Sequence, residues 1–172
     1  MRTKPSLEQA LCIVALLGIQ DRKVPLHSHL VAERLGVSTS YLKKIVQKLA
    51  AGGIVKTVSG RDGGIMLTKN PMKITLLDVF NAIEGTTAFV HNTGLVSKVF
   101  DLDQKDTFMT TYQLKDFKDT RPVANVMNVF AQAEKQFRQE LATLVIGDVL
   151  PTASGQPIQL DWTKWLTRPT AE

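Results

Sequence analysis

A chain of 172 residues with 44% hydrophobic and 22% charged residues has the composition of one folded domain, or of a small domain with an appendage, and not of a disordered chain. Its net charge of +5 is unevenly distributed: residues 1–73 hold twelve Lys and Arg against four Asp and Glu, a charge of +8, and residues 74–172 hold nine against twelve, a charge of −3. Such segregation is typical of a module that binds a polyanion, joined to a part with another task.

The cysteine content and the first twenty residues favour a cytoplasmic protein. One cysteine, Cys12, allows no intramolecular disulfide, which argues against a secreted fold held by bridges. The run ALCIVALLGI follows Arg2 and Lys4 as in a signal peptide, but Glu8 precedes it and no A-x-A-like cleavage site follows. The run is also too short to cross a bilayer, so we expect no membrane partner.

Regularly spaced apolar residues predict three helices at the start of the chain. The first covers 6–19, with Ser6 as its N-cap. The segment LHSHLVAERLG carries one apolar stripe and predicts a second helix that ends at Gly36. A third helix follows after a short turn, and either Ser38 or Thr39 can cap it. Its inward positions are Leu42, Ile45, Val46 and Leu49.

The outward face of this third helix is basic and polar, with Tyr41, Lys43, Lys44, Gln47 and Lys48. Two helices joined by a tight turn, the second with such a face, predict a helix-turn-helix with a recognition helix. The runs IVKTV and IMLT follow, joined by SGRDGG, and predict a β-hairpin, which in this place is a wing. Its glycines allow the backbone to approach DNA closely, and it delivers Arg61 to a phosphate or to the minor groove.

The second half of the chain is predicted to be helical as well. The segment ITLLDVFNAIEG predicts a fourth helix between Thr75 as N-cap and Gly85 as C-cap. Residues 86–121 have mixed periodicity, and a short helix is expected near 93–100. A long helix then covers 122–147.

The long helix begins with Pro122, after Asp119 or Thr120 as its cap. Its apolar residues fall close to a heptad repeat, at positions 123, 126, 130, 133, 137, 141 and 144. At ~1.5 Å per residue this helix is longer than one small winged-helix unit can cover, so we expect it to pair with a second copy. A long core helix within one chain is the alternative. LPTASGQP predicts a loop, and QLDWTKWL is expected to dock two tryptophans on the core or on the partner.

These elements together predict a mainly α fold with a small β-hairpin wing. Residues 1–85 form a winged helix-turn-helix DNA-binding domain, and residues 86–121 form a connecting segment with a role in effector binding. Residues 122–147 form the dimerisation helix, and residues 148–172 form a C-terminal tail. An effector pocket is expected between the fourth helix, the connecting segment and the long helix.

The stretch HLVAERLGVSTSYLKKIVQKLAAGGIVKTVSGRDGGIML together with ITLLDVFNAIEG resembles the winged helix-turn-helix regulators of the IscR, NsrR and CymR type, the Rrf family. The resemblance covers residues 6–85 and, by position and pattern, the long helix 122–147. It implies a homodimeric, cytoplasmic bacterial transcription regulator. Such proteins are mostly repressors of palindromic operators and respond to redox, nitrosative or metabolic signals.

The resemblance places Ser38, Ser40 and Tyr41 on DNA backbone and base edges. Lys43 and Lys44 follow. In much of the family this pair of positions includes an acidic or amide residue that can read bases, so two lysines here imply more phosphate contact or a different operator. The family's wing arginine corresponds to Ser59, with Arg61 two residues later, so it stays open whether Arg61 occupies the same groove. The expected DNA-binding residues are Ser38, Thr39, Ser40, Tyr41, Lys43, Lys44, Gln47, Lys48, Ser59 and Arg61.

No cofactor is expected. Iron–sulfur members of the family hold their cluster with cysteines in the loop after the fourth helix, because thiolates are the ligands of such clusters. Residues 86–121 contain no cysteine, so the chain resembles the cluster-free branch. Cys12 lies in an apolar run and is expected to be buried and inert. His27 and His29, two apart, are expected to point to different sides and not to hold a metal.

The sequence also lacks the motifs of the common enzyme classes, among them H-E-x-x-H, G-x-S-x-G and the phosphate-binding loop. We therefore expect a homodimeric repressor that binds double-stranded DNA and answers an unknown small-molecule or protein effector. Two alternatives remain. One is a protein-interaction module that uses a winged helix without sequence-specific DNA binding. The other, a small metalloenzyme, needs converging ligands that the sequence does not offer.

Overall fold

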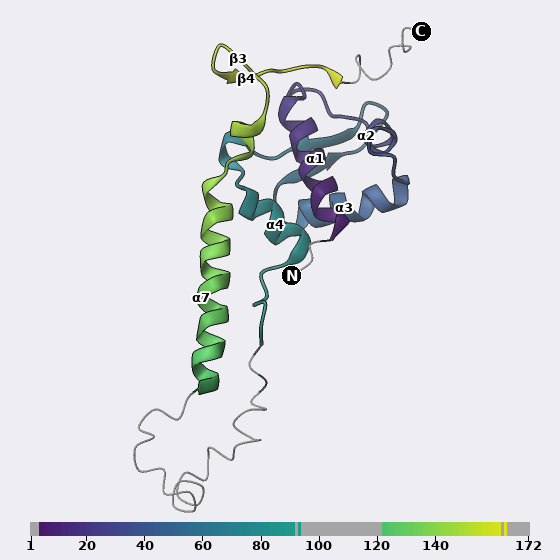
Figure 1. Ribbon diagram of the computed structural model, residues 1–172. Helices are drawn as coiled ribbons and strands as arrows, with labels where there is room; N and C mark the ends of the chain where they lie inside the picture. The colour runs from purple at the N-terminus through teal and green to yellow at the C-terminus, as the bar shows by residue number, and fades with distance from the viewer. Residues whose placement is uncertain (1–3, 92, 94–121, 163, 165–172) are drawn as a thin grey trace, which may run out of the picture. The chain divides into compact units, whose positions relative to one another are not determined.

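The computed structural model describes residues 4–91, 93, 122–162 and 164 (Figure 1). The chain divides into two compact units. The first unit consists of Met1–Thr86 and Glu140–Glu172, and the second of Thr87–Gln139. The first unit holds the predicted helix-turn-helix and wing, which confirms the predicted fold class.

The first helix, α1, covers Pro5–Ile19 and begins one residue before the predicted N-cap. Ser6 is therefore not the cap; Lys4 takes that position without a side-chain hydrogen bond. Pro5 explains the shift, because its fixed φ suits the first helical position and its missing N–H is not needed there. Lys4 is instead held by Glu84, with Nζ 3.0 Å from Oε2 and the backbone N 3.1 Å from Oε1.

Helices α2, Ser28–Leu35, and α3, Thr39–Ala51, form the predicted helix-turn-helix. Gly36 ends α2 in the left-handed conformation, with φ 63°, as predicted from its position. Ser38 is the N-cap of α3, since its Oγ accepts the Tyr41 N–H at 3.2 Å. Thr39, the alternative cap, is the first helical residue.

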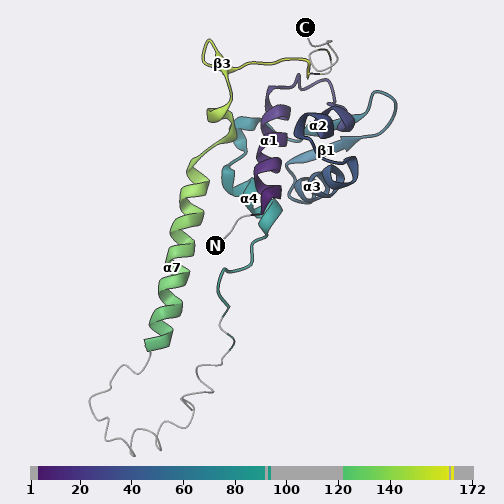
Figure 2. The same cartoon turned by 45° about the vertical axis from the view of Figure 1, so that its right-hand side comes forward.

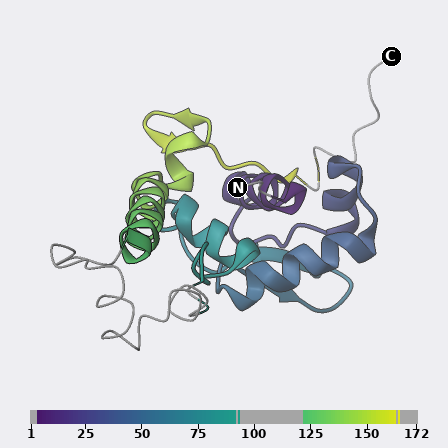
Figure 3. The ribbon, with the colours of Figure 1, turned by 60° about the horizontal axis from the view of Figure 1, so that its bottom comes forward.

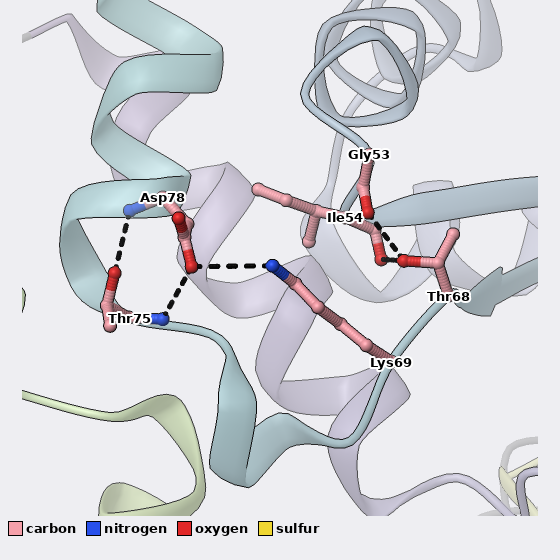
Figure 4. Close-up of polar contacts among 6 residues, drawn as sticks. All are labelled: Gly53, Ile54, Thr68, Lys69, Thr75 and Asp78. Carbon is pink, nitrogen blue, oxygen red and sulfur yellow. Dashed lines mark hydrogen bonds and ion pairs between the residues drawn. The ribbon is translucent and has the colours of Figure 1, made fainter.

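The wing consists of β1, Val55–Val58, and β2, Gly64–Leu67, which pair antiparallel. Its base is attached to the helices at two points. Leu26, just before α2, exchanges both backbone hydrogen bonds with Ile65. Thr68, just after β2, donates its hydroxyl to the carbonyls of Gly53 and Ile54 at the end of α3 (Figure 4).

Gly64 has an intramolecular reason to be glycine. A Cβ at this position would lie 2.3 Å from the Leu26 carbonyl oxygen and 2.6 Å from its carbonyl carbon. Real side chains do not approach backbone atoms so closely, so any other residue would separate the wing from α2. The prediction from the sequence connected the wing glycines with DNA alone.

A 3₁₀ helix, η1, Pro71–Lys73, and then α4, Leu76–Glu84, follow the wing. The predicted cap of α4 is confirmed and forms a full capping box: Thr75 Oγ1 accepts the Asp78 N–H at 3.1 Å, and Asp78 Oδ2 accepts the Thr75 N–H at 3.0 Å. Lys69 Nζ lies 3.6 Å from the same Asp78 oxygen, which ties the end of the wing to the start of α4 (Figure 4). Gly85 is the C-cap.

The core of the first unit forms around α1, which contacts α3, α4 and β2 and is seen nearly end-on in Figure 3. Burial of apolar side chains from every element of the winged helix excludes them from water and supplies the main stabilising term. The fully buried members include Ile13, Leu42, Ile45, Leu49 and Phe80.

The long helix α7 covers Pro122–Thr143 and ends four residues before the predicted boundary. The next residues pair with the segment before α4: Leu76 N–H donates to the Leu144 carbonyl at 2.9 Å, and Ile146 N–H to the Ile74 carbonyl at 2.8 Å. These bonds replace helical ones and stop the helix. The proposed caps 119 and 120, and the short helix expected near 93–100, lie outside the described residues.

The C-terminal segment is more ordered than the predicted loop. A 3₁₀ helix, η2, Ile146–Val149, precedes a two-stranded hairpin of β3, Thr152–Ala153, and β4, Gln156–Pro157. Ser154 and Gly155 both have positive φ, the backbone that two-residue hairpin turns need. Trp162 packs against the core as expected, while the second tryptophan lies outside the described residues.

The second unit contains a group of contacts between the C-terminal half of α7 and residues 87–89. Glu134 is central to it: its Oε2 accepts the Phe89 N–H at 2.9 Å, and its Oε1 lies 2.8 Å from Arg138 Nε. The Phe89 N–H, and after it the Arg138 guanidinium, lower the pKa of Glu134. The Arg138 guanidinium also lies over the Phe89 ring, at 5.4 Å.

Candidate nucleic-acid interface

The outward face of α3 is built as the sequence predicted. Leu42, Ile45, Val46 and Leu49 are buried on one side of the helix. Tyr41, with 37% of its surface exposed, and Lys43, Lys44 and Gln47 lie on the other, exposed side. Two ammonium groups, an amide and a phenol on one helix face can contact phosphates and base edges in a major groove.

The start of α3 is exposed at Ser38, Thr39 and Ser40. The Ser38 hydroxyl caps the helix and lies 3.1 Å from the Ser40 hydroxyl, so part of its hydrogen-bonding capacity is used within the protein. The unpaired N–H groups of a first helical turn are suited to a phosphate. Ser38 therefore combines a structural role with a place at the candidate interface.

Lys48 differs from the other cations of α3. Its Nζ donates to the carbonyl oxygen of Ile83, in the last turn of α4, at 2.9 Å. The last carbonyls of a helix have no partner inside the helix, and a cation is favoured at that end. The structure thus gives Lys48 a partner within the protein, where the sequence suggested a cation directed only at DNA.

The wing loop between β1 and β2 carries Ser59 and Arg61, both exposed (Figure 2 shows the loop projecting past α2 and α3). Within the described residues Arg61 forms no ion pair. Lys56 on β1 is a further exposed cation on the wing. Lys56 is not among the DNA-binding residues expected from the sequence, although its place in the predicted strand VKTV was a usable signal.

Two predictions about metal-binding or reactive side chains are corrected. Cys12 is exposed, not buried, because the buried stripe of α1 runs through Ala10, Ile13, Val14 and Leu17 and leaves position 12 on the other face. His27 and His29 do not point apart: their rings stack with centroids 5.5 Å apart. His27 is the extended N-cap residue before α2, so the helical geometry behind the prediction does not apply to it.

The described residues bring no three His, Cys, Asp or Glu side chains together as a metal site. Among them there is also no helix with the length and apolar character to cross a membrane.

Comparison with known proteins agrees with this geometry. The Rrf2 family, described as iron-dependent transcriptional regulators, matches residues 3–152. YwgB of Bacillus subtilis, assigned as an HTH-type transcriptional regulator, is 38% identical over 101 residues, 59% of this chain and 65% of YwgB, slightly less than two thirds of its length. YffB of Lactococcus lactis, with the same assignment, is 29% identical over 84% of this chain and 95% of its own.

Solved structures show the same fold. CymR, the global cysteine regulator of B. subtilis, superposes with a TM-score of 0.60 at 19% identity, over 87% of this chain and 95% of CymR. IscR of T. potens gives a TM-score of 0.52 at 22% identity, over 86% of this chain and 85% of its own. The family is one of transcriptional regulators and not of enzymes. By its sequence match and its winged-helix structure, this chain belongs to the Rrf2 family of transcriptional regulators.

Proposed function

We propose that this chain is a cytoplasmic, homodimeric repressor that binds a palindromic operator and responds to a redox or metabolic signal. The observation that carries the proposal is the exposed basic and polar face of α3 together with a wing that carries an exposed arginine. In this account the two recognition helices of the dimer enter successive major grooves, and the wings contact the flanking DNA backbone.

Each side chain has a role that follows from its exposure and chemistry. Lys43 and Lys44 anchor phosphates, because ammonium groups contribute charge and little base information. Tyr41 and Gln47 combine positioning with base readout. Ser38, Thr39 and Ser40 present the first turn of α3 to the DNA backbone. On the wing, Arg61 contacts a phosphate or the minor groove, and Ser59 and Lys56 add further contacts to the DNA backbone.

The homodimer is proposed from the apolar side of α7. Val129 is 63% exposed, and Val126 and Phe130 are each 51% exposed. Val126 and Phe130 occupy the predicted heptad seam, and large apolar side chains in such a seam bury their surface against a second helix. A second copy of this helix is the partner that we propose.

We further propose that the protein works without an iron–sulfur cluster, although its family is described as iron-dependent. Such clusters are held by several cysteine thiolates. This chain has one cysteine, Cys12, exposed on α1 and not within residues 86–121. The donor set does not fit the cluster, so the signal must reach the protein by another chemistry.

An interaction module that docks a protein on the winged helix is the competing function. Selection of DNA by the purified protein from a random-sequence duplex pool distinguishes the two. We expect an enriched two-fold symmetric motif whose half-sites are centred about 34 Å, one helical turn, apart. A pool that stays random after several rounds would favour the interaction module.

A further inference from the structure

A cavity of about 310 Å³ lies in the first unit, on the side of α1 near its C-terminal end. It is lined by Gly18 and Arg22, by Asn70 and Met72 around η1, and by Pro157 and Gln159 from the C-terminal segment. Its volume lies at the lower end of the range of small-molecule sites, ~300–1,000 Å³. The proposed DNA-binding residues do not line it.

Two lining side chains, Arg22 and Asn70, offer hydrogen-bond donors to the cavity. Asn70 Oδ1 already accepts the Met72 N–H at 3.0 Å, which leaves the Asn70 amide group as a donor. Arg22 offers only donors and is the one charged side chain among the described residues that line the cavity. In the part of the chain that the structure describes, neither side chain donates to a protein acceptor. Both residues are exposed, so both side chains can contact a ligand with acceptor oxygens and a negative charge.

The wall of the cavity formed by the C-terminal segment is fixed by backbone pairing. Leu160 N–H donates to the Ile19 carbonyl at 2.7 Å, and Asp21 N–H donates to the Leu160 carbonyl at 2.9 Å. Gln20, only 2% exposed, accepts the Trp162 N–H at 2.9 Å. On the other side of Gln159, the Ile158 N–H donates to the Pro151 carbonyl at 2.9 Å. The chain is thus fixed before and after Gln159, so this wall is formed before a ligand enters.

Part of this wall lies outside the family match. The match ends at residue 152, and Pro157 and Gln159 lie beyond it. The apolar side of the cavity comes from Met72, Pro71 and Pro157. The lining thus combines a cationic fork with an apolar surface, which suits a small molecule that has an oxyanion at one end and an apolar body at the other.

We propose that this cavity binds a small organic oxyanion, with Arg22 and Asn70 on the charged group and Met72 and Pro157 on the apolar body. The role of this cavity as an effector site rests on the proposed function as a regulator. The binding of an oxyanion in the cavity does not depend on that function. The cavity follows the wing in the chain, through Thr68, Lys69 and η1, so occupancy can act on the wing. From the sequence, the effector pocket is expected elsewhere, between α4, the connecting segment 86–121 and α7.

Benzoate and phenyl phosphate test the proposal in the absence of DNA, with neutral benzamide as the matched probe. Binding to the full chain is followed by amide shift changes in NMR spectra. We expect benzoate or phenyl phosphate to shift Gly18, Asn70 and Gln159, and benzamide to bind at least about tenfold more weakly. Binding of neither anion, or equal binding of benzamide, would overturn the proposal.

Two variants locate the site. Arg22→Gln should weaken binding of the anion at least about tenfold. Met72→Trp should block binding of the anion, because the larger side chain fills the cavity. Arg34→Gln removes the same charge from an exposed position of α2 and should leave the affinity for the anion unchanged. An equal loss in Arg34→Gln would mean a nonspecific charge effect and would also overturn the site. Because DNA is absent, failure here leaves the DNA-binding proposal untouched, and failure of DNA binding leaves this result standing.

Discussion

The ammonium group of Lys48 lies 2.9 Å from the carbonyl oxygen of Ile83, so the recognition helix α3 is bonded to the last turn of α4. The helices also approach closely, since a methyl group at Gly52 would lie 2.8 Å from the Cβ of Ala82. The orientation of α3 therefore depends on α4. Because α4 follows the wing in the chain, α4 is connected to both parts of the candidate DNA interface, the recognition helix α3 and the wing.

Lys48→Met tests this link. The substitution keeps most of the apolar stem and removes the donor, so we expect the free energy of unfolding to fall by about 1 kcal/mol, the usual contribution of one hydrogen bond. Urea denaturation measures this change. Lys43→Met, at an exposed position of the same helix, is the control and should leave stability within about 0.5 kcal/mol. Equal stability of Lys48→Met and the wild type would show that the bond does not orient α3.

Gly64→Ala should destabilise the first unit by about 2 kcal/mol, because its Cβ would overlap the Leu26 backbone and force the wing away from α2. Thermal and urea denaturation provide the measurement. Thr57→Ala, exposed on the partner strand, serves as the matched change and should have a much smaller effect. A wild-type stability for Gly64→Ala would mean that the wing is not packed on Leu26 as described.

The ion pair of Glu84 with Lys4 predicts a pH dependence. Burial raises the pKa of Glu84, but the hydrogen bonds and charge of Lys4 outweigh it and the net pKa is lowered. A carboxyl whose folded pKa is depressed stabilises the fold above its unfolded pKa of about 4.3, and this contribution is lost as the pH falls through the folded value.

Glu84→Gln should therefore lose less stability than the wild type between pH 6 and the acidic range below about pH 4. Urea midpoints measured across this range test it, with Glu33→Gln on the exposed face of α2 as the comparison. If the urea midpoints of the wild type and of Glu84→Gln fall in parallel with pH, Glu84 does not contribute to the acid sensitivity of the fold.

Phe130→Glu should convert the proposed dimer to monomer, since it places a charge where apolar surface would be buried. Sedimentation velocity gives the mass directly. Gln132→Glu adds the same charge at an exposed position of α7 on the other side of the seam, and it should stay dimeric. A monomeric wild type would contradict the homodimer.

Most features of the fold that follow from local chemistry were predictable from the sequence, although the N-cap of α1 was placed two residues too late. The cap of α3, predicted at Ser38 or Thr39, is Ser38. The stop of α2 at Gly36 and the Thr75 cap of α4 also depend on residues within a few positions, and both are confirmed. The outward face of α3 follows from its helical period alone. The predicted roles of its side chains toward DNA remain predictions.

The features that depend on distant parts of the chain were not predictable. The end of α7 is set by backbone bonds from Ile74 and Leu76, about seventy residues earlier in the sequence. Lys48 and Ile83 are likewise 35 residues apart. Cys12 was misplaced because α1 is apolar around most of its circumference, so its pattern does not show which side is buried.

Fluorescence anisotropy with the DNA upstream of the protein's own gene and with a scrambled duplex, each over a range of salt concentrations, tests the central claim most directly. We expect the native duplex to bind at least ~10³ tighter, with a steep loss of affinity as salt rises. Lys44→Ala should lower the log–log salt slope by about one unit, and Lys135→Ala on α7 should not change it. Equal and weak binding of both duplexes, with no effect of Lys44→Ala, would contradict a sequence-specific regulator and favour the protein-interaction module.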